Sequence, residues 1–291
     1  MARKNERQRR QAREKYRRQQ ELRVARQRQL RKRWLTGTVA VLAAALIASL
    51  ALILPGGSPK KPAASPSKSP SASPTASATT VAGPAHHCSY TAATPAARKV
   101  SLPPTAPNYT ASYQATINTN LGKITFNLLN NKATCTVNSF VHLAEAGYFN
   151  NTQCHRLLTS GIYVLQCGDP YATAAATLSC STTSKIGTGT PGYDFASENL
   201  TGATYPTGTV AMANEGRAST NGSQFFIVFK DSTSGLNGSS GPAYTPFATV
   251  SAGLGIVQNV AKDGYSCQYA QAGGGVPKKK VIIDSVTIKK T

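Results

Sequence analysis

Residues 211–229 read Ala-Met-Ala-Asn-Glu-Gly-Arg-Ala-Ser-Thr-Asn-Gly-Ser-Gln-Phe-Phe-Ile-Val-Phe. The last six of these residues, Gln224–Phe229, form an apolar, aromatic-rich run that follows a loop rich in Gly, Ser and Thr, so they predict a short buried strand. Phe225 and Phe226 must point to opposite faces of that strand. At least one of the two rings therefore belongs to the core, and by pattern alone both would be assigned to packing.

Further short strands are predicted on both sides of this stretch. Apolar and polar residues alternate over 115–119 and 123–128 around Asn120-Leu-Gly122, which is typical of a β-hairpin. Residues 161–166 and 282–288 also have the composition of strands. Many short strands indicate a closed or nearly closed antiparallel sheet, because closure removes exposed edges.

Only two helices are predicted beside these strands. Thr136 can cap the first, Gly147 can end it, and four apolar residues fall on one helical face: Val137, Phe140, Val141 and Ala144. A second short helix is predicted over 254–261. The fold class is therefore mainly β.

Two pairs of motifs go beyond these patterns. Cys154-His155-Arg156 is followed by Tyr163-Val-Leu-Gln166, and Ala211-Met-Ala-Asn214 is followed by Asn221-Gly-Ser-Gln-Phe-Phe226. Together they resemble the cyclophilin family, over roughly residues 112–290. The resemblance implies a closed eight-stranded antiparallel barrel capped by two helices, which catalyses rotation about the peptide bond before proline without a cofactor or a metal.

The resemblance also implies roles for individual residues. Arg156 is expected to direct its guanidinium toward the prolyl nitrogen, Gln166 to hydrogen-bond the substrate backbone, and Phe226 to floor an apolar pocket for the proline ring. Gln224 is expected to orient the arginine or a substrate group. The remaining residues expected to bind substrate are Tyr163, Val164, Ala213, Asn214, Leu236 and Tyr244. His155 should face the other side of its strand, so we expect it to be structural.

The sequence departs from the family pattern at three places. Tyr244 stands where many cyclophilins have a pocket histidine, and Thr159-Ser-Gly-Ile-Tyr-Val164 replaces a shorter Pro-Gly-Phe-Met stretch. The family's cyclosporin-binding tryptophan has no counterpart, because Trp34 is the only tryptophan and the matching neighbourhood reads Ser234-Gly-Leu236. We expect a shifted substrate preference and weak cyclosporin sensitivity.

Two functions remain open from the sequence. The first is an isomerase that acts on proline-containing polypeptides outside the cytoplasm and assists their folding, because prolyl isomerisation is a slow folding step. The alternative is a catalytically weak module or chaperone that binds proline-containing peptides in the same groove. Replacing Arg156 would lower the rate only in the first case. In either case we expect a monomer.

Charge and hydropathy predict a membrane anchor at the N-terminus. Residues 1–33 contain 15 Lys or Arg against 3 Glu, out of a net charge of +21 for all 291 residues. This basic tail ends at Trp34 and a run without charge that extends to Leu54, long enough for one transmembrane helix. The tail should stay in the cytoplasm and the rest of the chain should lie outside, in a single-pass cell-membrane protein.

A cleaved signal peptide is the competing interpretation of the same segment. Its apolar region is usually about 7–15 residues and is followed by a small-residue cleavage site. The run here is longer and ends in Pro55-Gly56-Gly57. A retained anchor is therefore favoured. Specific nucleic-acid binding is not expected, since only weak, salt-sensitive binding by residues 1–33 follows from the charge.

The chain is thus divided into four parts: a basic cytoplasmic tail at 1–33, a transmembrane helix at 34–54, a disordered linker rich in Pro, Ser, Ala and Thr at 55–108, and a catalytic domain at 109–291. His86 and His87 precede Cys88, but no second ligand cluster lies nearby in sequence, so no metal site is expected.

All six cysteines follow the predicted span, in an oxidising compartment where disulfides form. Six cysteines allow fifteen complete pairings. Cys154 and Cys167 flank the predicted hairpin that carries Arg156 and Gln166, so a disulfide between them is one hypothesis. Two buried, unpaired cysteines are the alternative.

Overall fold

The computed structural model of this chain describes residues 87–291, apart from 94, 218, 239–242 and 271–272. The predicted tail at 1–33, the predicted membrane span at 34–54 and most of the predicted linker lie outside the described residues. Among the described residues, no helix combines the length and the apolar composition that crossing a bilayer requires.

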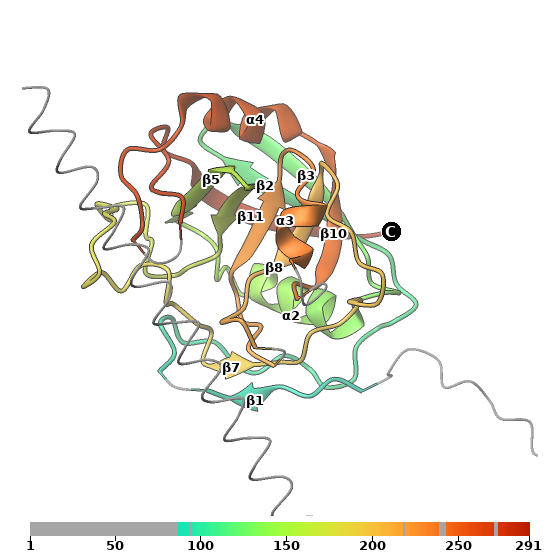
Figure 1. Cartoon of the computed structure of the whole chain (residues 1–291). Helices are drawn as coiled ribbons and strands as arrows, with labels where there is room; N and C mark the ends of the chain where they lie inside the picture. The colour runs from blue at the N-terminus through green and yellow to red at the C-terminus, as the bar shows by residue number, and fades with distance from the viewer. Residues whose placement is uncertain (1–86, 94, 218, 239–242, 271–272) are drawn as a thin grey trace, which may run out of the picture. The chain divides into compact units, whose positions relative to one another are not determined.

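Nine strands form one curled antiparallel sheet (Figure 1). They are β2 (Tyr113–Thr119), β3 (Gly122–Leu128), β4 (Thr152–Gln153), β5 (Arg156–Ser160), β6 (Ile162–Cys167), β8 (Thr209–Met212), β9 (Phe225–Val228), β10 (Pro246–Ala252) and β11 (Ile282–Lys290). Their order across the sheet is β4-β11-β2-β3-β10-β8-β9-β6-β5. Two further short strands, β1 (Thr91–Ala92) and β7 (Tyr193–Asp194), pair with each other in a separate small sheet.

The prediction of a closed eight-stranded barrel is wrong, because the sheet has two edges. The edge strands β4 and β5 do not pair with each other. At one edge, β4 is only two residues long. At the opposite edge, β5 forms a β-bridge with a single residue, Gly275. There the amide of Leu157 donates to the carbonyl of Gly275 over 2.8 Å, and the amide of Gly275 donates back over 2.9 Å. A loop thus covers the edge that a further strand would have closed.

The predicted strands and hairpin are confirmed. β2 and β3 pair across a two-residue turn, with Thr119 opposite Gly122. Gly122 has φ +122°, which an L side chain rarely adopts and which glycine tolerates without strain. Ile117 and Ile124 are directly paired and buried, so the alternation in the sequence correctly gives the inward face.

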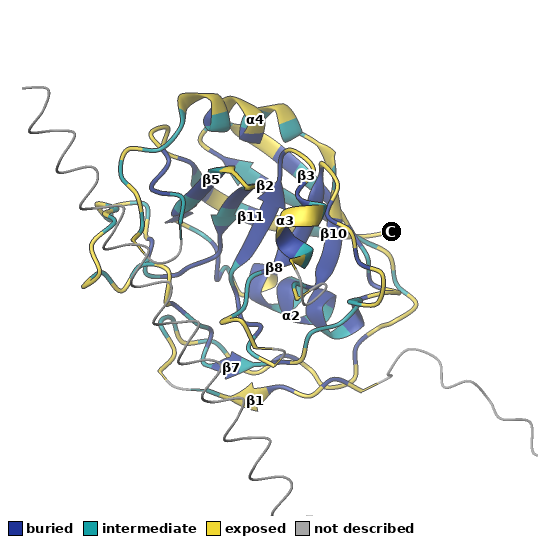
Figure 2. Cartoon of the chain, in the orientation of Figure 1, coloured by how far each residue is buried: buried dark blue, intermediate teal, exposed yellow. Residues whose placement is uncertain are grey.

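Both predicted helices are present, together with one short extra helix. They are α2 (Thr134–Glu145) and α4 (Leu254–Asp263), and the extra helix is α3 (Thr233–Asn237). Figure 1 shows α2 and α4 at opposite ends of the curled sheet. Figure 2 shows exposed residues along the outer side of α4, whose buried residues are Val257 and Val260.

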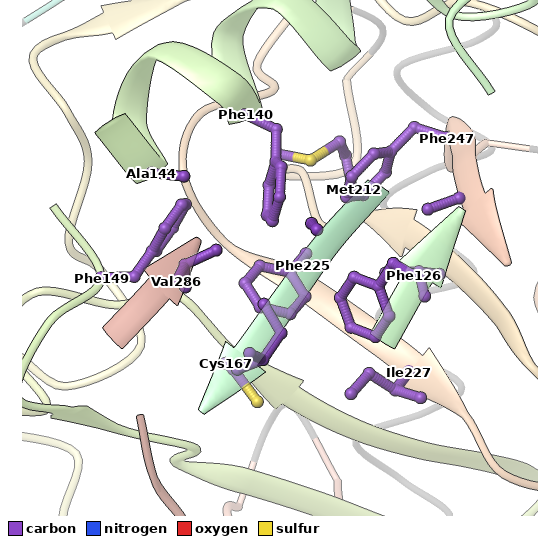
Figure 3. Packing of buried hydrophobic residues seen from close by; sticks show 14 of the residues in the cluster. Phe126, Phe140, Ala144, Phe149, Cys167, Met212, Phe225, Ile227, Phe247 and Val286 are labelled. Carbon is purple, nitrogen blue, oxygen red and sulfur yellow. The ribbon is translucent and has the colours of Figure 1, made fainter. Parts of the chain in front are cut away.

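Aromatic rings fill the main core between α2 and the sheet (Figure 3). Phe140 of α2 lies with its ring centroid 5.6 Å from that of Phe225 on β9 and 5.2 Å from those of Phe149 and Phe247. Such tilted and edge-on pairs add to the stabilisation that burial itself gives. The predicted apolar face of α2 therefore anchors the helix on the sheet and fixes β9.

Residues 87–108, which the sequence assigns to the linker, pack against the folded domain. Cys88 is fully buried and forms a disulfide with Cys135 of α2. Tyr90 donates a hydrogen bond of 2.8 Å to the carbonyl of Cys135, and its ring contacts Tyr193 and Phe195 edge-on. The packed domain therefore includes described residues that precede 109.

Candidate active site

Four residues lie in one row across four neighbouring strands. Arg156 on β5 pairs with Gln166 on β6, Gln166 pairs with Phe226 on β9, and Phe226 pairs with Ala211 on β8. Directly paired residues of antiparallel strands project to the same face of the sheet. Strand register alone therefore brings the side chains of these four residues side by side, although they are far apart in sequence.

A chain of hydrogen bonds begins at the guanidinium of Arg156. Its Nη1 donates to Oε1 of Gln166 over 3.1 Å, and Nε2 of Gln166 donates to Oε1 of Gln224 over 2.9 Å. Because a guanidinium can only donate, the oxygen of the Gln166 amide must face Arg156 and its nitrogen must face Gln224. Gln166 thus orients the arginine directly, and Gln224 acts on the arginine through Gln166.

Both ends of this chain are held by backbone carbonyls. At one end, Nε of Arg156 donates to the carbonyl of Gly273 over 3.0 Å. At the other end, Nε2 of Gln224 donates to the carbonyls of Gly187 and Gly189 over 3.1 and 3.0 Å. The guanidinium is therefore fixed in place, which Arg156 alone, as a long flexible side chain, could not achieve.

The charge of Arg156 lies in a partly buried setting. Burial lowers the pKa of the Arg156 guanidinium, and the nearby hydroxyls of Tyr244 and Tyr269 act in the opposite direction. Arginine is nevertheless protonated at any pH near neutrality. The site therefore presents a permanent cation at a fixed position.

An apolar cluster surrounds Phe226 beside this cation. Phe226 is 4% exposed, and it is packed with Leu158, Val164, Ala203, Tyr205, Ala211, Val228 and Leu236, with Ile162, Ala213 and Tyr244 at the margin. The ring of Tyr244 meets that of Phe226 edge-on, with 5.4 Å between centroids. The Tyr205 hydroxyl donates to the backbone carbonyl of Tyr244 over 2.7 Å and so holds the Tyr244 backbone in place.

The structure brings most of the predicted site residues together, with one exception. Val164, Leu236 and Tyr244 all contribute to the cluster around Phe226. Tyr163 does not, because neighbouring residues of a strand face opposite sides and Val164 occupies the site face. The Tyr163 ring instead meets Phe229 edge-on at 6.0 Å on the core side, with the ammonium of Lys230 4.5 Å from its centroid.

A polar cleft of about 90 Å³ adjoins the row on its other side. Gln166, Gln224, Ala213 and Asn214 line it, together with Gly187 to Thr190 and the carboxylates of Asp194 and Glu215. Ala213 belongs both to this cleft and to the margin of the apolar cluster. The two surfaces are therefore continuous past Ala213.

The Asn214 side chain shapes the wall of the cleft. Its Nδ2 donates to the carbonyl of Ala243 over 2.7 Å, and its Oδ1 accepts from the amide of Gly216 over 2.9 Å. Asn214 thus holds two loops at the rim.

The hypothesis of a Cys154–Cys167 disulfide is confirmed by the structure, with 4.0 Å between the two Cα atoms. The other pairs are Cys88–Cys135 and Cys180–Cys267, so all six cysteines are bonded. Among the described residues, no three His, Cys, Asp or Glu side chains gather as metal ligands. The arrangement offers a fixed cation, an apolar cluster around Phe226 and a polar cleft.

The backbone acceptors of the site escaped the sequence prediction. Carbonyls carry no residue-type signal, but the run Gly273-Gly274-Gly275 is a sign of close backbone approach. A Cβ on Gly274 would lie 2.3 Å from the carbonyl oxygen of Leu157. Tyr205 and Tyr269 were also missed, because their contacts are far away in sequence.

Comparison with known proteins gives a consistent family. The model of the family "Cyclophilin type peptidyl-prolyl cis-trans isomerase/CLD" matches residues 114–288. A protein of Mycobacterium leprae named "Probable peptidyl-prolyl cis-trans isomerase B" is 40% identical over 221 residues, which cover 69% of this chain and 66% of that protein. Its namesake in Mycobacterium tuberculosis is 41% identical over 212 residues, which cover 66% of this chain and 60% of that protein.

The aligned part is thus less than two thirds of the length of each of these two relatives, at 66% and 60%. Among solved structures, a cyclophilin-type peptidyl-prolyl cis-trans isomerase of Cryptosporidium parvum is similar with a TM-score of 0.48 and 23% identity, over 62% of this chain and 99% of that one.

Proposed function

This chain belongs to the family of cyclophilin-type peptidyl-prolyl cis-trans isomerases, and on that basis we propose that it accelerates the cis-trans exchange of X-Pro bonds. The observation that carries the proposal is the row of Arg156, Gln166 and Phe226 in direct register on three adjacent strands. That row sets a fixed cation beside the apolar cluster around Phe226.

Those two features suit the chemistry of the reaction. Rotation about an amide bond is opposed by resonance, with a barrier of about 18–20 kcal/mol. In the twisted amide the lone pair becomes localised on the prolyl nitrogen, where a hydrogen-bond donor can stabilise it. A donor that favours the twisted state over the planar one raises the rate about tenfold for each 1.36 kcal/mol of preference.

In the proposed mechanism, Arg156 is that donor. The proline ring enters beside Phe226, with Val164 and Leu236 as further walls, and the acyl side of the bond rotates while the ring stays fixed. Gln166 and Gln224 keep the guanidinium in position. The residues that flank proline run along Ala213 and Asn214 toward the polar cleft.

The alternative of a catalytically weak peptide-binding module has one observation in its favour. Phe226 is 4% exposed and packs against the Tyr244 ring at 5.4 Å in a T-shaped pair, so a proline ring must displace part of this packing to contact it. The backbone of Tyr244 is bonded on both sides to the Tyr205 hydroxyl. A site that opens slowly would bind peptides and turn them over poorly.

Replacing Arg156 separates the two functions. For an isomerase, Arg156→Ala should lower kcat for a proline-containing peptide about 100-fold, since a charged donor aimed at the reacting atom is lost. Arg156→Lys should keep the charge and still lose most of the rate, because an ammonium lacks the rigid planar donors. For a binding module, neither variant changes the already low rate.

Arg98→Ala is the matched control for this experiment. Arg98 also donates to backbone carbonyls, those of Tyr148 and Asn150, but it lies in the N-terminal segment and not in the row. Its loss should leave kcat unchanged, although stability should fall. Equal kcat for Arg156→Ala and Arg98→Ala would contradict the isomerase proposal.

We further propose that the domain works outside the cytoplasm, held to the membrane by one helix at 34–54, and assists the folding of exported chains. The three disulfides support an oxidising compartment, where such bonds persist. Protease treatment of intact cells tests the topology, because it should degrade the domain and spare the tail.

A further inference from the structure

Two separate loops hold the opposite ends of the hydrogen-bond chain through Arg156. Residues 264–278, between α4 and β11, supply the Gly273 carbonyl to Nε of Arg156. Residues 170–192 supply the Gly187 and Gly189 carbonyls to Gln224. The position of the guanidinium therefore depends on where these two loops lie.

The loop at 264–278 is fastened to the strand that carries Arg156. Gly275 and Leu157 exchange two backbone hydrogen bonds of 2.8 and 2.9 Å. Tyr269 donates its amide to the carbonyl of Gly274 over 2.8 Å and its hydroxyl to the carbonyl of His155 over 3.1 Å. These bonds fix the position of the Gly273 carbonyl relative to β5.

The loop at 170–192 is organised around a buried carboxylate. Asp169 has no exposed surface, and it accepts hydrogen bonds from the amides of Tyr171, over 2.8 Å, and Gly187. Between those two amides the loop first bonds to β4, where Gln153 donates its amide to the carbonyl of Ala172 over 2.7 Å and its side-chain nitrogen to the carbonyls of Thr173 and Ala176 over 2.7 and 2.8 Å. Cys180 follows this bonded part. Cys180 forms a disulfide with Cys267 of the other loop, with 5.9 Å between the Cα atoms.

We infer that the Cys180–Cys267 disulfide is a positioning element for Arg156: it ties together the two loops whose carbonyls hold the two ends of the Arg156–Gln166–Gln224 chain. Tyr269, two residues beyond Cys267, is the positioning residue that links this disulfide to the strand of the arginine. The inference rests on the proposed catalytic role of Arg156.

The physical reason is the high sensitivity of catalysis to the position of a donor. A displacement of about 1 Å at a catalytic group can cost about 100-fold in rate. Cutting the disulfide leaves each loop held only by its own hydrogen bonds, and the guanidinium then samples more often positions in which Nε no longer meets the Gly273 carbonyl. The cluster around Phe226 contains no residue of the loop at 170–192, which reaches the polar cleft only through Gly187 to Thr190. We therefore expect kcat to fall much more than KM changes.

The test compares two disulfide deletions in the full chain. Cys180→Ser with Cys267→Ser should lower kcat for a proline-containing peptide about tenfold, the effect of loosening one hydrogen bond to a charged group, with a much smaller change in KM. Cys88→Ser with Cys135→Ser removes a disulfide that lies between α2 and the N-terminal segment, and it should keep kcat. Both pairs of substitutions should lower Tm, which separates lost stability from lost positioning. Equal kcat for the two variants would overturn the inference.

Tyr269→Phe gives a milder version of the same test. It removes only the hydroxyl that reaches the His155 carbonyl, so the fold is kept, and kcat should fall about threefold at constant KM and near-constant Tm. If Tyr269→Phe leaves kcat unchanged, Tyr269 does not position the arginine.

A double-mutant cycle shows whether these residues act through Arg156. In the Arg156→Ala background, the Cys180→Ser, Cys267→Ser pair should cause no further loss of kcat, because the group that it positions is gone. A full tenfold loss in that background would overturn the inference and leave the proposed function intact. If Arg156→Ala itself has no effect on kcat, the proposed function fails first.

Discussion

At the start of β5, two neighbouring residues have opposite electrostatic settings. Arg156 projects into the site as a cation held by Gln166 and the Gly273 carbonyl. His155 is 2% exposed, and neither of its ring nitrogens has a hydrogen-bond partner within the described residues. Burial, followed by the neighbouring charge of Arg156, lowers the pKa of His155 to about 3. The folded state therefore contains the neutral imidazole.

The first prediction concerns stability against pH. Because the folded pKa of His155 is lower than its ordinary value of 6.5, only the unfolded chain takes up this proton between those two values. The contribution of His155 is fully present above about pH 6.5 and is lost toward about pH 3, at about 1.4 kcal/mol per pH unit. Urea unfolding at pH 7 and pH 4.5 should show a loss of about 3 kcal/mol from this group.

His155→Leu should remove the contribution of His155 to the slope of the unfolding free energy against pH and leave the other contributions unchanged. Burial raises the pKa of Asp169, which acts with the opposite sign, since the folded state then holds the proton more tightly. Asp169 is present in both proteins, so their difference isolates His155. An unchanged slope in His155→Leu would mean that the buried histidine is not neutral.

At the scale of elements, α2 depends on a residue distant in sequence. The sequence predicts Thr136 as the cap, but the helix starts at Thr134 and its N-cap, Ala133, has no side-chain hydrogen bond. Instead Glu198 accepts from the amides of Cys135 and Thr136 over 3.1 and 2.7 Å, and from the Thr136 hydroxyl over 2.7 Å. A carboxylate at this end also interacts favourably with the helix dipole.

The second prediction follows from this cap. Glu198→Ala should lower the free energy of unfolding by about 1–2 kcal/mol, because two helix amides lose their acceptor. Glu198→Gln should cost less than Glu198→Ala, since it keeps one of the two oxygen acceptors, although it loses the charge and the other acceptor. Glu145→Ala, in the last turn of the same helix, should cost nothing, because a negative charge there opposes the dipole. Urea unfolding would contradict the cap if Glu198→Ala and Glu145→Ala were equally stable.

This cap illustrates the limit of prediction from the sequence. The extent of α2 and of the β2–β3 hairpin follows from local periodicity, because each element is decided within about a dozen residues. The partner of the helix end is 62 residues away from Thr136, and no local pattern indicates it. The acceptor at Gly273 is even farther from Arg156, at a separation of 117 residues.

The candidate site likewise has features that the sequence predicts and features that it does not. Motif resemblance correctly brings Arg156, Gln166 and Phe226 together, and the structure adds the register that aligns them. The sequence alone already argues against Tyr163 as a site residue. Side chains alternate along a strand, so the residue that shares the face of Gln166 is Val164 and not Tyr163. Closure of the sheet was not predictable, since it depends on how far β4 and the Gly275 segment extend.

At the scale of the whole molecule, the folded unit includes the segment at 87–108. Besides the Cys88–Cys135 disulfide, Asn138 of α2 donates to the Tyr90 hydroxyl over 2.7 Å and to the Pro104 carbonyl over 2.8 Å. The segment also pairs through β1 with β7. It therefore ties α2, which anchors the aromatic core, to the loop region that precedes β8.

The third prediction tests that tie with two fragments. Residues 87–291 should be more stable than residues 109–291 by about 4 kcal/mol or more, because the shorter fragment lacks a disulfide that closes a loop of 47 residues and also the packing of Tyr90. Cys88→Ser with Cys135→Ser in the longer fragment separates these two contributions, and its free energy of unfolding should lie between those of the two fragments. Since the row from Arg156 to Ala211 contains none of the removed residues, the shorter fragment should keep its kcat at temperatures where it is folded. Fragments that unfold at the same urea concentration would show that the segment adds nothing to the domain, and that its contacts with α2 are too weak to matter.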